Sequence, residues 1–370
     1  MSETGTYAVV AGGGTSGHVL PALAIIDALV ARGHDRASML YVGAQRGVET
    51  RLVPPTGVPH VFLDVVGVQR RIARSNLRFP DKLARAVRAM VRRFRSDRPQ
   101  VVISVGGYAS LPAVLAARRL GVPVIVVNYD KLPGRASRLA ARFAVACATA
   151  FDDSPLPRAR VTGAPLRREI VTLDASAARP SARAELGLPA ERFVLAVMGG
   201  SQGSGVLNDA VSWLVDSWSS RSDIAIRHIV GERFVGQASP ARDGAAGILY
   251  QVIGYEDRMP SVYAAADAVL VRGGASTIAE IAAVGVASIV VPWAGAADDH
   301  QTINARILGD LDAAVVLAER DLDGPRLAAE VERMVADPGY RRALAARAWE
   351  AGAVHRSDAL VRLVEEVVAR

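Results

Sequence analysis

The chain has 370 residues, of which 51% are hydrophobic and 22% charged, a balance typical of a globular protein of about two domains rather than of a disordered chain. Its single cysteine, Cys147, excludes a disulfide framework and a thiolate metal cluster. No apolar run approaches the roughly 18–20 residues that a membrane span requires, and the first residues lack the basic region of a signal peptide. We therefore expect a soluble, cytoplasmic protein.

One segment carries more than the whole net charge of +7. Arg70–Arg98 holds eleven bases and two acids, which leaves 33 bases and 35 acids for the rest of the chain. Apolar residues recur in it at helical spacing, at Leu83, Val87, Met90, Val91 and Phe94. Three interpretations stay open: a helix lying on an anionic membrane surface, a nucleic-acid contact, and a core-packed helix with a solvated basic face.

Two stretches of the chain open in the same way, with a buried strand, a glycine-rich turn and a helix. The first comprises Tyr7–Ala11, Gly12–Gly17 and a helix from about Leu20 to Ala31; the second comprises Phe193–Met198 and Gly199–Gly205. Further strands are predicted at Ala37–Val42, Val101–Val105, Val122–Val127, Ala268–Val271 and Ala287–Val291, and a final helix at Tyr340–Arg370. This alternation predicts an α/β protein of two doubly wound domains.

Glycine-rich turns follow four of the predicted strands, at Gly12–Gly17, Gly106–Ser110, Gly199–Gly203 and Gly273–Thr277. Such turns aim backbone N–H groups and a helix N-terminus at an anion, and we expect all four to line one cleft between the two halves. The first turn fits neither the dinucleotide-binding pattern nor G-x-x-x-x-G-K-[ST]. This disfavours a nicotinamide oxidoreductase and a P-loop hydrolase.

Three sets of polar residues stand beside these turns. His18 directly follows the first turn, at a position where a substrate would lie, which favours a functional histidine. Glu280 lies one helical turn beyond Ser276, so its carboxylate could reach a ribose diol. Asp298 and Asp299 are interpreted as a helix N-cap rather than a metal pair, and no other pattern predicts a metal site.

Five motifs occur in a fixed order: Gly12-Gly-Gly-Thr-Ser-Gly-His-Val-Leu-Pro-Ala22, Gly106-Gly-Tyr-Ala-Ser-Leu-Pro-Ala113, Gly199-Gly-Ser-Gln-Gly203, Ala275-Ser-Thr-Ile-Ala-Glu280 and His300-Gln-Thr-Ile-Asn-Ala305. Together they resemble the MurG-type UDP-N-acetylglucosamine transferases of peptidoglycan synthesis. The resemblance implies a GT-B fold with an N-terminal domain at 1–165, a UDP-sugar domain at 166–346 and a C-terminal helix at about 347–370 that packs back on the first domain.

The resemblance also implies an activity and its surroundings. The family transfers N-acetylglucosamine (GlcNAc) from UDP-GlcNAc to the C4 hydroxyl of the muramoyl sugar of lipid I, with inversion, without a metal or other cofactor, and gives lipid II. The implied location is the cytoplasmic face of the cell membrane, as a peripheral protein. Arg70–Arg98 corresponds to the segment by which the family docks on anionic lipid, so the resemblance favours the membrane-surface interpretation of this segment. Nucleic acid is not an expected partner.

The resemblance implies roles for individual residues. Ser201 and the stretch Ala275, Ser276, Thr277, Ile278, Ala279 and Glu280 correspond to the diphosphate and ribose contacts. The backbone near Glu256 corresponds to the uracil-reading segment, and Gln301 with His300 to the contact with the sugar hydroxyls. Thr15, Ser16, Gly17 and His18 correspond to groups facing the sugar and the acceptor diphosphate, and Arg167 to a donor-site arginine.

One motif departs from the family. Where the family has His-Glu-Gln-Asn, this chain reads Val127-Asn-Tyr-Asp130, so Asn128 replaces a glutamate, and Ala164 stands where the family commonly has asparagine. Asn128 cannot act as a base, whereas Asp130 restores a carboxylate two residues later. We expect His18 to act as base or proton relay with Asp130 assisting, and Asn128 to remain a substrate contact.

Two other functions remain alternatives. The first is a related UDP-sugar transferase with another acceptor, such as a natural product or a diacylglycerol. The departures from the family motif at Asn128 and Asp130 are the reason for considering it. The second is a catalytically weak UDP-sugar-binding scaffold. Acceptor-dependent release of UDP distinguishes all three.

Overall fold

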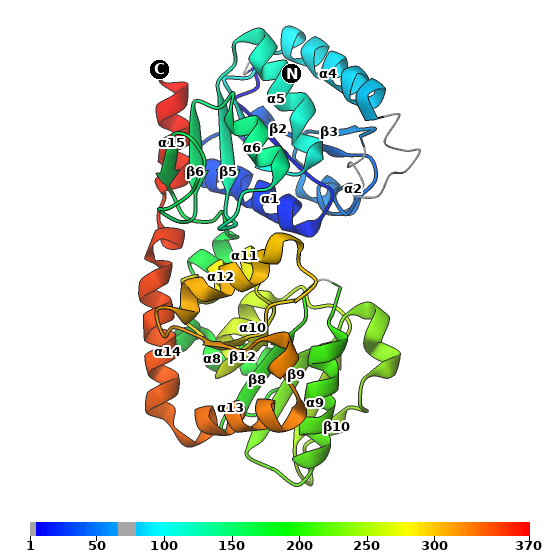
Figure 1. Cartoon of the computed structure of the whole chain (residues 1–370), viewed down its shortest axis with the longest axis vertical. Coiled ribbons are helices and arrows are strands. Elements are labelled where there is room, and N and C mark those ends of the chain that lie inside the picture. The colour runs from blue at the N-terminus through cyan, green and yellow to red at the C-terminus, as the bar shows by residue number, and fades with distance from the viewer. Residues whose placement is uncertain (1–4, 66–78, 201) are drawn as a thin grey trace. The chain divides into compact units, whose positions relative to one another are not determined.

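The computed structural model describes residues 5–65, 79–200 and 202–370 and divides into two compact units. Unit 1 comprises Met1–Arg168 and Ser357–Arg370, and unit 2 comprises Glu169–Arg356. Each unit has its own seven-stranded sheet with helices on both faces (Figure 1). The predicted fold class, an α/β protein with two doubly wound sheets, is therefore confirmed.

The sheet of unit 1 has the strand order β3-β2-β1-β4-β5-β6-β7, and its neighbouring strands pair in parallel. Near-continuous runs of buried apolar residues suit such a sheet, because helices cover both of its faces. The strands are β1 (Ala8–Gly12), β2 (Met39–Ala44), β3 (His60–Leu63), β4 (Val101–Gly106), β5 (Val124–Asn128), β6 (Ala146–Thr149) and β7 (Ala159–Val161). The order reverses between β1 and β4, where open α/β sheets bind ligands.

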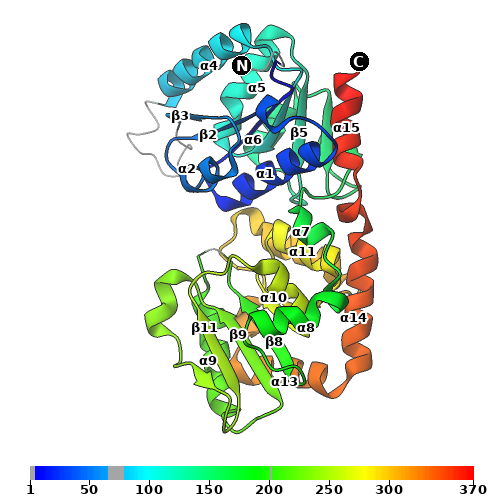
Figure 2. The same ribbon diagram turned by 180° about the vertical axis from the view of Figure 1, so that it is seen from behind.

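Helices α4, α5 and α6 pack on one face of this sheet, and α1 and α15 pack on the other (Figures 1 and 2). Their bounds are α1 (Ser16–Ala31), α4 (Phe79–Ser96), α5 (Leu111–Leu120), α6 (Arg135–Ala141) and α15 (Ala359–Val368), with the short α2 (Glu49–Leu52) and α7 (Arg168–Val171) and the 3₁₀ turns η1 (Arg36–Ser38), η2 (Pro54–Thr56) and η3 (Tyr108–Ser110). The small alanines of α5 and α6 let these helices approach the sheet closely.

The sheet of unit 2 has the order β10-β11-β9-β8-β12-β13-β14 and is parallel except for the edge pair β10 and β11. Its strands are β8 (Phe193–Met198), β9 (Ile224–Ile229), β10 (Arg242–Asp243), β11 (Leu249–Ile253), β12 (Ala268–Val271), β13 (Ala287–Val290) and β14 (Val315–Val316). The order again reverses between β8 and β12. The turns after these two strands are the ones that the sequence marks as rich in glycine.

Helices α9 and α13 share a core with one face of the second sheet, and α10 lies over the other face together with α8 (Figure 2). The helices are α8 (Ala175–Glu185), α9 (Gly205–Ser217), α10 (Met259–Ala265), α11 (Ala275–Val284), α12 (His300–Gly309), α13 (Gly324–Ala336) and α14 (Pro338–Ala351), with the 3₁₀ turns η4 (Glu232–Gln237), η5 (Ala297–Asp299), η6 (Glu319–Asp321) and η7 (Gly352–Arg356).

The C-terminal segment differs from the single helix expected over Tyr340–Arg370. Helix α14 ends at Ala351, η7 follows, and α15 begins at Ala359. Helix α15 packs on α1 and β4 of unit 1, where Glu365 accepts hydrogen bonds from Arg32 and His34 at 3.1 and 3.2 Å. The break falls at Gly352, whose position cannot hold a side chain, because a Cβ there would lie 2.0 Å from the carbonyl oxygen of Ala282.

Candidate active site

Two glycine turns of unit 1 meet at the switch point between β1 and β4. Gly106 and Gly107 both adopt positive φ angles, of +100° and +72°. A Cβ on Gly107 would lie 2.5 Å from the carbonyl oxygen of Gly13, so the two turns touch through their backbones. Only glycine at position 107 allows this approach.

His18 lies in this meeting point, on the first turn of α1. A Cβ on Gly106 would lie 3.3 Å from its Cδ2, and its Nδ1 lies 3.1 Å from the hydroxyl oxygen of Thr15. Burial lowers the pKa of His18, and the carboxylates of Asp130 and Glu49 oppose that shift without cancelling it. His18 is therefore neutral at pH 7 and able to accept a proton.

The turn after β5 brings Asp130 within electrostatic reach of His18. Asn128, at the end of β5, is buried and donates from Nδ2 to the carbonyl oxygen of Asp130 at 2.6 Å. Tyr129 is also buried, and its hydroxyl donates to the carbonyl oxygen of Gly17. The residues that replace the family motif thus shape this turn and bond it to the first turn of α1, so Asn128 has a structural partner in addition to any substrate contact.

Glu49 is a residue of this region that the sequence analysis missed. It begins α2, is fully buried, and accepts hydrogen bonds at Oε1 from the backbone N–H groups of Gly14 and Ala44, at 3.0 and 2.9 Å. The signal available in the sequence is Gly43-Ala-Gln-Arg-Gly47, two glycines that leave room for a carboxylate. The N–H of Gly14 was expected to face a bound anion. It donates instead to the carboxylate of Glu49.

In unit 2, the turn between β12 and α11 presents a helix N-terminus. Gly274 is the N-cap of α11 and has no side chain, so no side-chain oxygen occupies the N–H groups of the first turn. These N–H groups belong to Ala275, Ser276 and Thr277, and together with the helix dipole they suit a phosphate. Ile278 and Ala279 are buried, and the N–H of Ile278 bonds to Gly274, which leaves these two residues no free polar group.

The carboxylate of Glu280 is hydrogen-bonded to a buried tyrosine, Tyr263. Its Oε2 accepts a hydrogen bond from the hydroxyl of Tyr263 at 2.8 Å, and Tyr263 is 1% exposed. Tyr263 lies on α10, and nothing in its local sequence connects it with Glu280. The carboxylate is therefore oriented by a residue that only the tertiary structure identifies.

Gln301 and Arg272 organise the loop that follows β13. The N–H of Trp293 donates to Oε1 of Gln301 at 3.0 Å, which leaves the Gln301 amide N–H groups for another partner. The next N–H, of Ala294, donates to Glu319 at 2.8 Å. Glu319 accepts from Arg272 at 2.6 Å, and Arg272 also donates to Ser204, the N-cap of α9, at 2.6 Å. Arg272 was not among the predicted site residues, although it directly precedes the predicted Gly273–Thr277 turn.

Glu256 has a fully occupied side chain. Arg227 of β9 donates to it through Nη2 and through Nε at 3.2 Å, and Arg258 donates its backbone N–H and Nε at 3.0 and 3.1 Å. Burial alone would raise the pKa of Glu256, but these hydrogen bonds lower it. The carboxylate thus holds the Tyr255–Arg258 turn in shape, and its own oxygens are already occupied by these four hydrogen bonds.

The other predicted residues fall into three groups. Ser201, the side chain of Ser16 and positions 66–78 lie outside the described residues. Arg167, partly buried just before α7, makes no hydrogen bond or ion pair to a described residue. His300 is the first residue of α12. Asp299 is the N-cap residue of α12, as predicted, but its carboxylate accepts from the Thr302 hydroxyl at 2.6 Å rather than from a backbone N–H.

Comparisons with known proteins place this architecture in a family. Residues 8–149 match the glycosyltransferase family 28 N-terminal domain, and residues 194–360 match the glycosyltransferase family 28 C-terminal domain. A crystal structure of Acinetobacter baumannii MurG superposes with a TM-score of 0.74 at 26% identity, covering 98% of this chain and 99% of that chain. The two sheets, their glycine turns and these matches define a GT-B glycosyltransferase.

Two relatives narrow this class. Both are named UDP-N-acetylglucosamine–N-acetylmuramyl-(pentapeptide) pyrophosphoryl-undecaprenol N-acetylglucosamine transferase. The one from Cutibacterium acnes is 41% identical over 332 residues, 88% of either chain, and the one from Desulforudis audaxviator is 35% identical over 372 residues, 98% of either chain. The chain belongs to this family of transferases, and the predicted family resemblance is confirmed.

Proposed function

We propose that the chain transfers GlcNAc from UDP-GlcNAc to the C4 hydroxyl of the N-acetylmuramyl-pentapeptide carried on undecaprenyl diphosphate, lipid I, and so forms lipid II for peptidoglycan. The observation that carries the proposal is 41% identity, over 88% of the chain, to a transferase named for this donor and acceptor. The open N-terminus of α11 and the tyrosine-held Glu280 support the nucleotide side.

Unit 2 supplies the donor half-site in this proposal. The N–H groups of Ala275, Ser276 and Thr277 bind the diphosphate with Ser201, and Arg167 adds a positive charge that stabilises UDP as it leaves. Glu280 accepts hydrogen bonds from the ribose hydroxyls. The backbone of the turn at Glu256 reads uracil, and Gln301 donates to the sugar hydroxyls, with His300 beside it.

Unit 1 supplies the acceptor half-site. Neutral His18 takes the proton from the attacking hydroxyl, and the Asp130 carboxylate stabilises the imidazolium that forms. Thr15, Ser16, Gly17 and Asn128 contact the sugar and the acceptor diphosphate. Attack opposite the departing UDP inverts the anomeric centre. Because protein N–H groups and Arg167 meet the charge of UDP, we infer that the transfer continues in the presence of EDTA.

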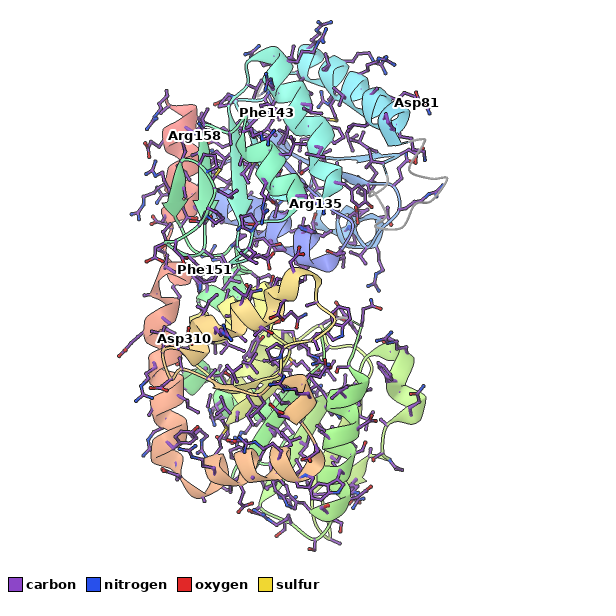
Figure 3. All side chains as sticks on the ribbon, in the orientation of Figure 1. Asp81, Arg135, Phe143, Phe151, Arg158 and Asp310 are labelled. Atoms are coloured by element: carbon purple, nitrogen blue, oxygen red, sulfur yellow. The ribbon has the colours of Figure 1, made fainter. Side chains whose placement is uncertain are left out.

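Helix α4 supplies a basic face for an anionic membrane surface. Met90, Val91 and Phe94, expected as part of an apolar stripe, are buried in the core of unit 1, so these residues are not available to insert into lipid. Arg88, Arg92 and Arg95 are exposed, at spacings that place them along one side of the helix. Asp81, paired with Arg85, marks the first turn of this helix in Figure 3.

The membrane contact of α4 is accordingly electrostatic, and it holds the protein on the cytoplasmic face near its lipid-linked acceptor. Nucleic acid is not a partner in this proposal. Among the described residues, none of the helices combines the length and the apolar character needed to cross a bilayer. Residues 70–78 of the predicted Arg70–Arg98 patch lie outside the described residues.

A different acceptor is the second candidate, because the turn after β5 departs from the family motif at Asn128 and Asp130. The experiment that separates the two measures UDP release from UDP-GlcNAc with a short-chain lipid I analogue, a diacylglycerol, or no acceptor. We expect release only with the lipid I analogue, and a product heavier by one N-acetylhexosamine. Donor binding without transfer to this analogue contradicts the proposal. As a test of mechanism, His18→Ala is expected to lower kcat by about 10²–10⁴-fold with donor binding unchanged.

A further inference from the structure

The first glycine turn of unit 1, Gly12–Gly14, packs around the carboxyl group of a buried side chain, Glu49. The Glu49 side chain is completely buried, and Oε1 accepts N–H groups from Gly14 at 3.0 Å and Ala44 at 2.9 Å. Its second oxygen, Oε2, has no hydrogen-bond partner among the described residues. A buried carboxylate with so few partners lowers stability, because its desolvation is only partly compensated by hydrogen bonds.

Three glycines make room for this carboxylate. A Cβ on Gly13 would lie 2.4 Å from Oε1, one on Gly47 would lie 2.2 Å from Oε2, and one on Gly43 would lie 3.2 Å from Cγ. The Gly12–Gly14 turn is thus built around the Glu49 side chain. Beside it, the hydroxyl of Tyr41 donates to the carbonyl oxygen of Gly12 at 2.5 Å, so the turn is held by one charged and one neutral group.

The same turn leads directly into the first turn of α1, which carries His18. Two carboxylates act on the imidazole, Asp130 from the turn after β5 and Glu49 from α2. Two phenols besides Tyr41 contact this region: Tyr129 bonds to the carbonyl oxygen of Gly17, and the ring of Tyr108 lies 3.3 Å from the Cβ position of Gly14. Glu49 also bonds to the glycine turn, through the N–H of Gly14.

We propose that Glu49 is a positioning residue of the transfer reaction. Its buried carboxylate fixes the Gly12–Gly14 turn that presents His18, and its charge supports the imidazolium formed during proton transfer. Glu49 does not touch the substrate in this scheme. The inference rests on the proposed role of His18 as the base and extends it to a residue on a separate helix.

The central test compares Glu49→Gln with the parent protein. Glutamine keeps the size of the side chain and an oxygen acceptor for Gly14 and Ala44, but it removes the charge. We expect kcat to fall about 10- to 100-fold with the KM for UDP-GlcNAc within about 2-fold, because the donor half-site is in unit 2. The acid limb of the rate profile is expected to move to lower pH, since the charge that favours protonated His18 is gone.

Two further variants separate charge from geometry. Tyr41→Phe removes the neighbouring bond to Gly12 without changing any charge, so it is expected to lower kcat and leave the His18 titration in place. Glu191→Gln neutralises an exposed glutamate of unit 2 and is the matched control, with no change expected in either measurement. The His18 titration is followed by NMR of the imidazole C–H signals in the full chain, assigned with His18→Ala.

The NMR titration is independent of catalysis. A lower His18 midpoint in Glu49→Gln together with reduced kcat supports the inference. An unchanged midpoint overturns it, and so does a shifted midpoint with unchanged turnover. If Glu49→Gln does not fold, Tyr41→Phe decides: wild-type kcat in that variant shows that the turn needs no support and overturns the inference. Absence of acceptor-dependent transfer in the parent protein refutes the proposed function instead, while the titration still tests the charge of Glu49 on His18.

Discussion

The imidazole of His18 lies against the backbone of Gly106, with Cδ2 only 3.3 Å from the position that a Cβ on Gly106 would take. The same Cβ would lie 3.2 Å from the hydroxyl oxygen of Ser137. Gly106, the last residue of β4, therefore restricts the position of a side chain on α1. Substitutions at this glycine test whether the position of His18 matters for the reaction.

Gly106→Ala is expected to reduce kcat about 100-fold, because the new methyl group displaces His18. The φ of +100° also strains any L-residue there, at a cost of about 1–2 kcal/mol of stability. Gly33→Ala is the matched control: its φ is +103°, and nothing lies within 4 Å of its Cβ position. Steady-state kinetics and thermal unfolding of both variants distinguish the contact with His18 from backbone strain. Equal loss of activity in the two variants would mean that strain, not the contact with His18, lowers kcat.

Asp130→Asn removes the other carboxylate that raises the pKa of His18. We expect kcat to fall about 10-fold or more and the acid limb of the profile to move to lower pH, because the imidazolium loses a stabilising charge. The measurement is the pH dependence of kcat with the lipid I analogue. Asp152→Asn, which neutralises an exposed aspartate of the same unit, should leave the profile in place. A wild-type profile in Asp130→Asn would exclude Asp130 from the proton transfer.

Tyr263→Phe tests the orientation of Glu280. Loss of the 2.8 Å hydrogen bond removes a contact that orients the carboxylate, so the KM for UDP-GlcNAc should rise about 3- to 10-fold while kcat changes little. Tyr250→Phe removes a hydroxyl equally buried in unit 2, bonded to His228 at 3.0 Å, and is expected to affect stability but not this KM. Equal KM values for the two variants would show that Tyr263 has no role in donor binding.

The basic face of α4 predicts binding to anionic vesicles. Replacement of Arg88, Arg92 and Arg95 by glutamine should weaken partitioning onto phosphatidylglycerol vesicles about 100-fold at low salt, at about 1 kcal/mol per arginine. Glutamines at Arg233, Arg320 and Arg342, exposed arginines of unit 2, change the net charge equally and serve as the control. Equal loss in both triple variants would mean that net charge rather than α4 governs the binding.

Two buried histidines predict a loss of stability in acid. Burial lowers the pKa of His228 to about 3 and that of His355 to about 4, while an unfolded chain protonates histidine near pH 6.5. The unfolded state therefore binds more protons as the pH falls below about 6.5, and the free energy of unfolding decreases. At pH 5, His228 alone accounts for about 2 kcal/mol. Their stability contribution is fully present above pH 6.5.

Urea unfolding at pH 7.5 and pH 5.0 measures this loss. His228→Gln cannot take up a proton, so its difference between the two pH values should be smaller than that of the parent protein. His60→Gln, at an exposed histidine, should keep the parental difference. If His228→Gln shows the full parental difference, other groups cause the acid instability.

Much of the fold could be predicted because it depends on local patterns. Strands β8 and β12 have the predicted bounds, and β1, β2, β4, β5 and β13 begin and end within a few residues of theirs. Buried apolar runs alternating with helical periods suffice for this, since each run reports only on its own burial. Helix α1 begins at Ser16, earlier than expected from Leu20, because its first turn, Ser16-Gly-His-Val19, lacks the apolar period from which the start was predicted.

The chain's own residues, read in order, also determine the glycine turns, the placement of His18 at the start of α1 and the family to which the protein belongs. Three relationships depended on the tertiary structure: Gly14 bonds to Glu49 across 35 positions, Tyr263 holds Glu280 across 17, and the apolar side of α4 packs into the core of unit 1. The physical reason is the same in each case. A periodic pattern in the sequence shows whether a side chain is buried or exposed. Which residue it contacts depends on which strands and helices become neighbours in the folded protein.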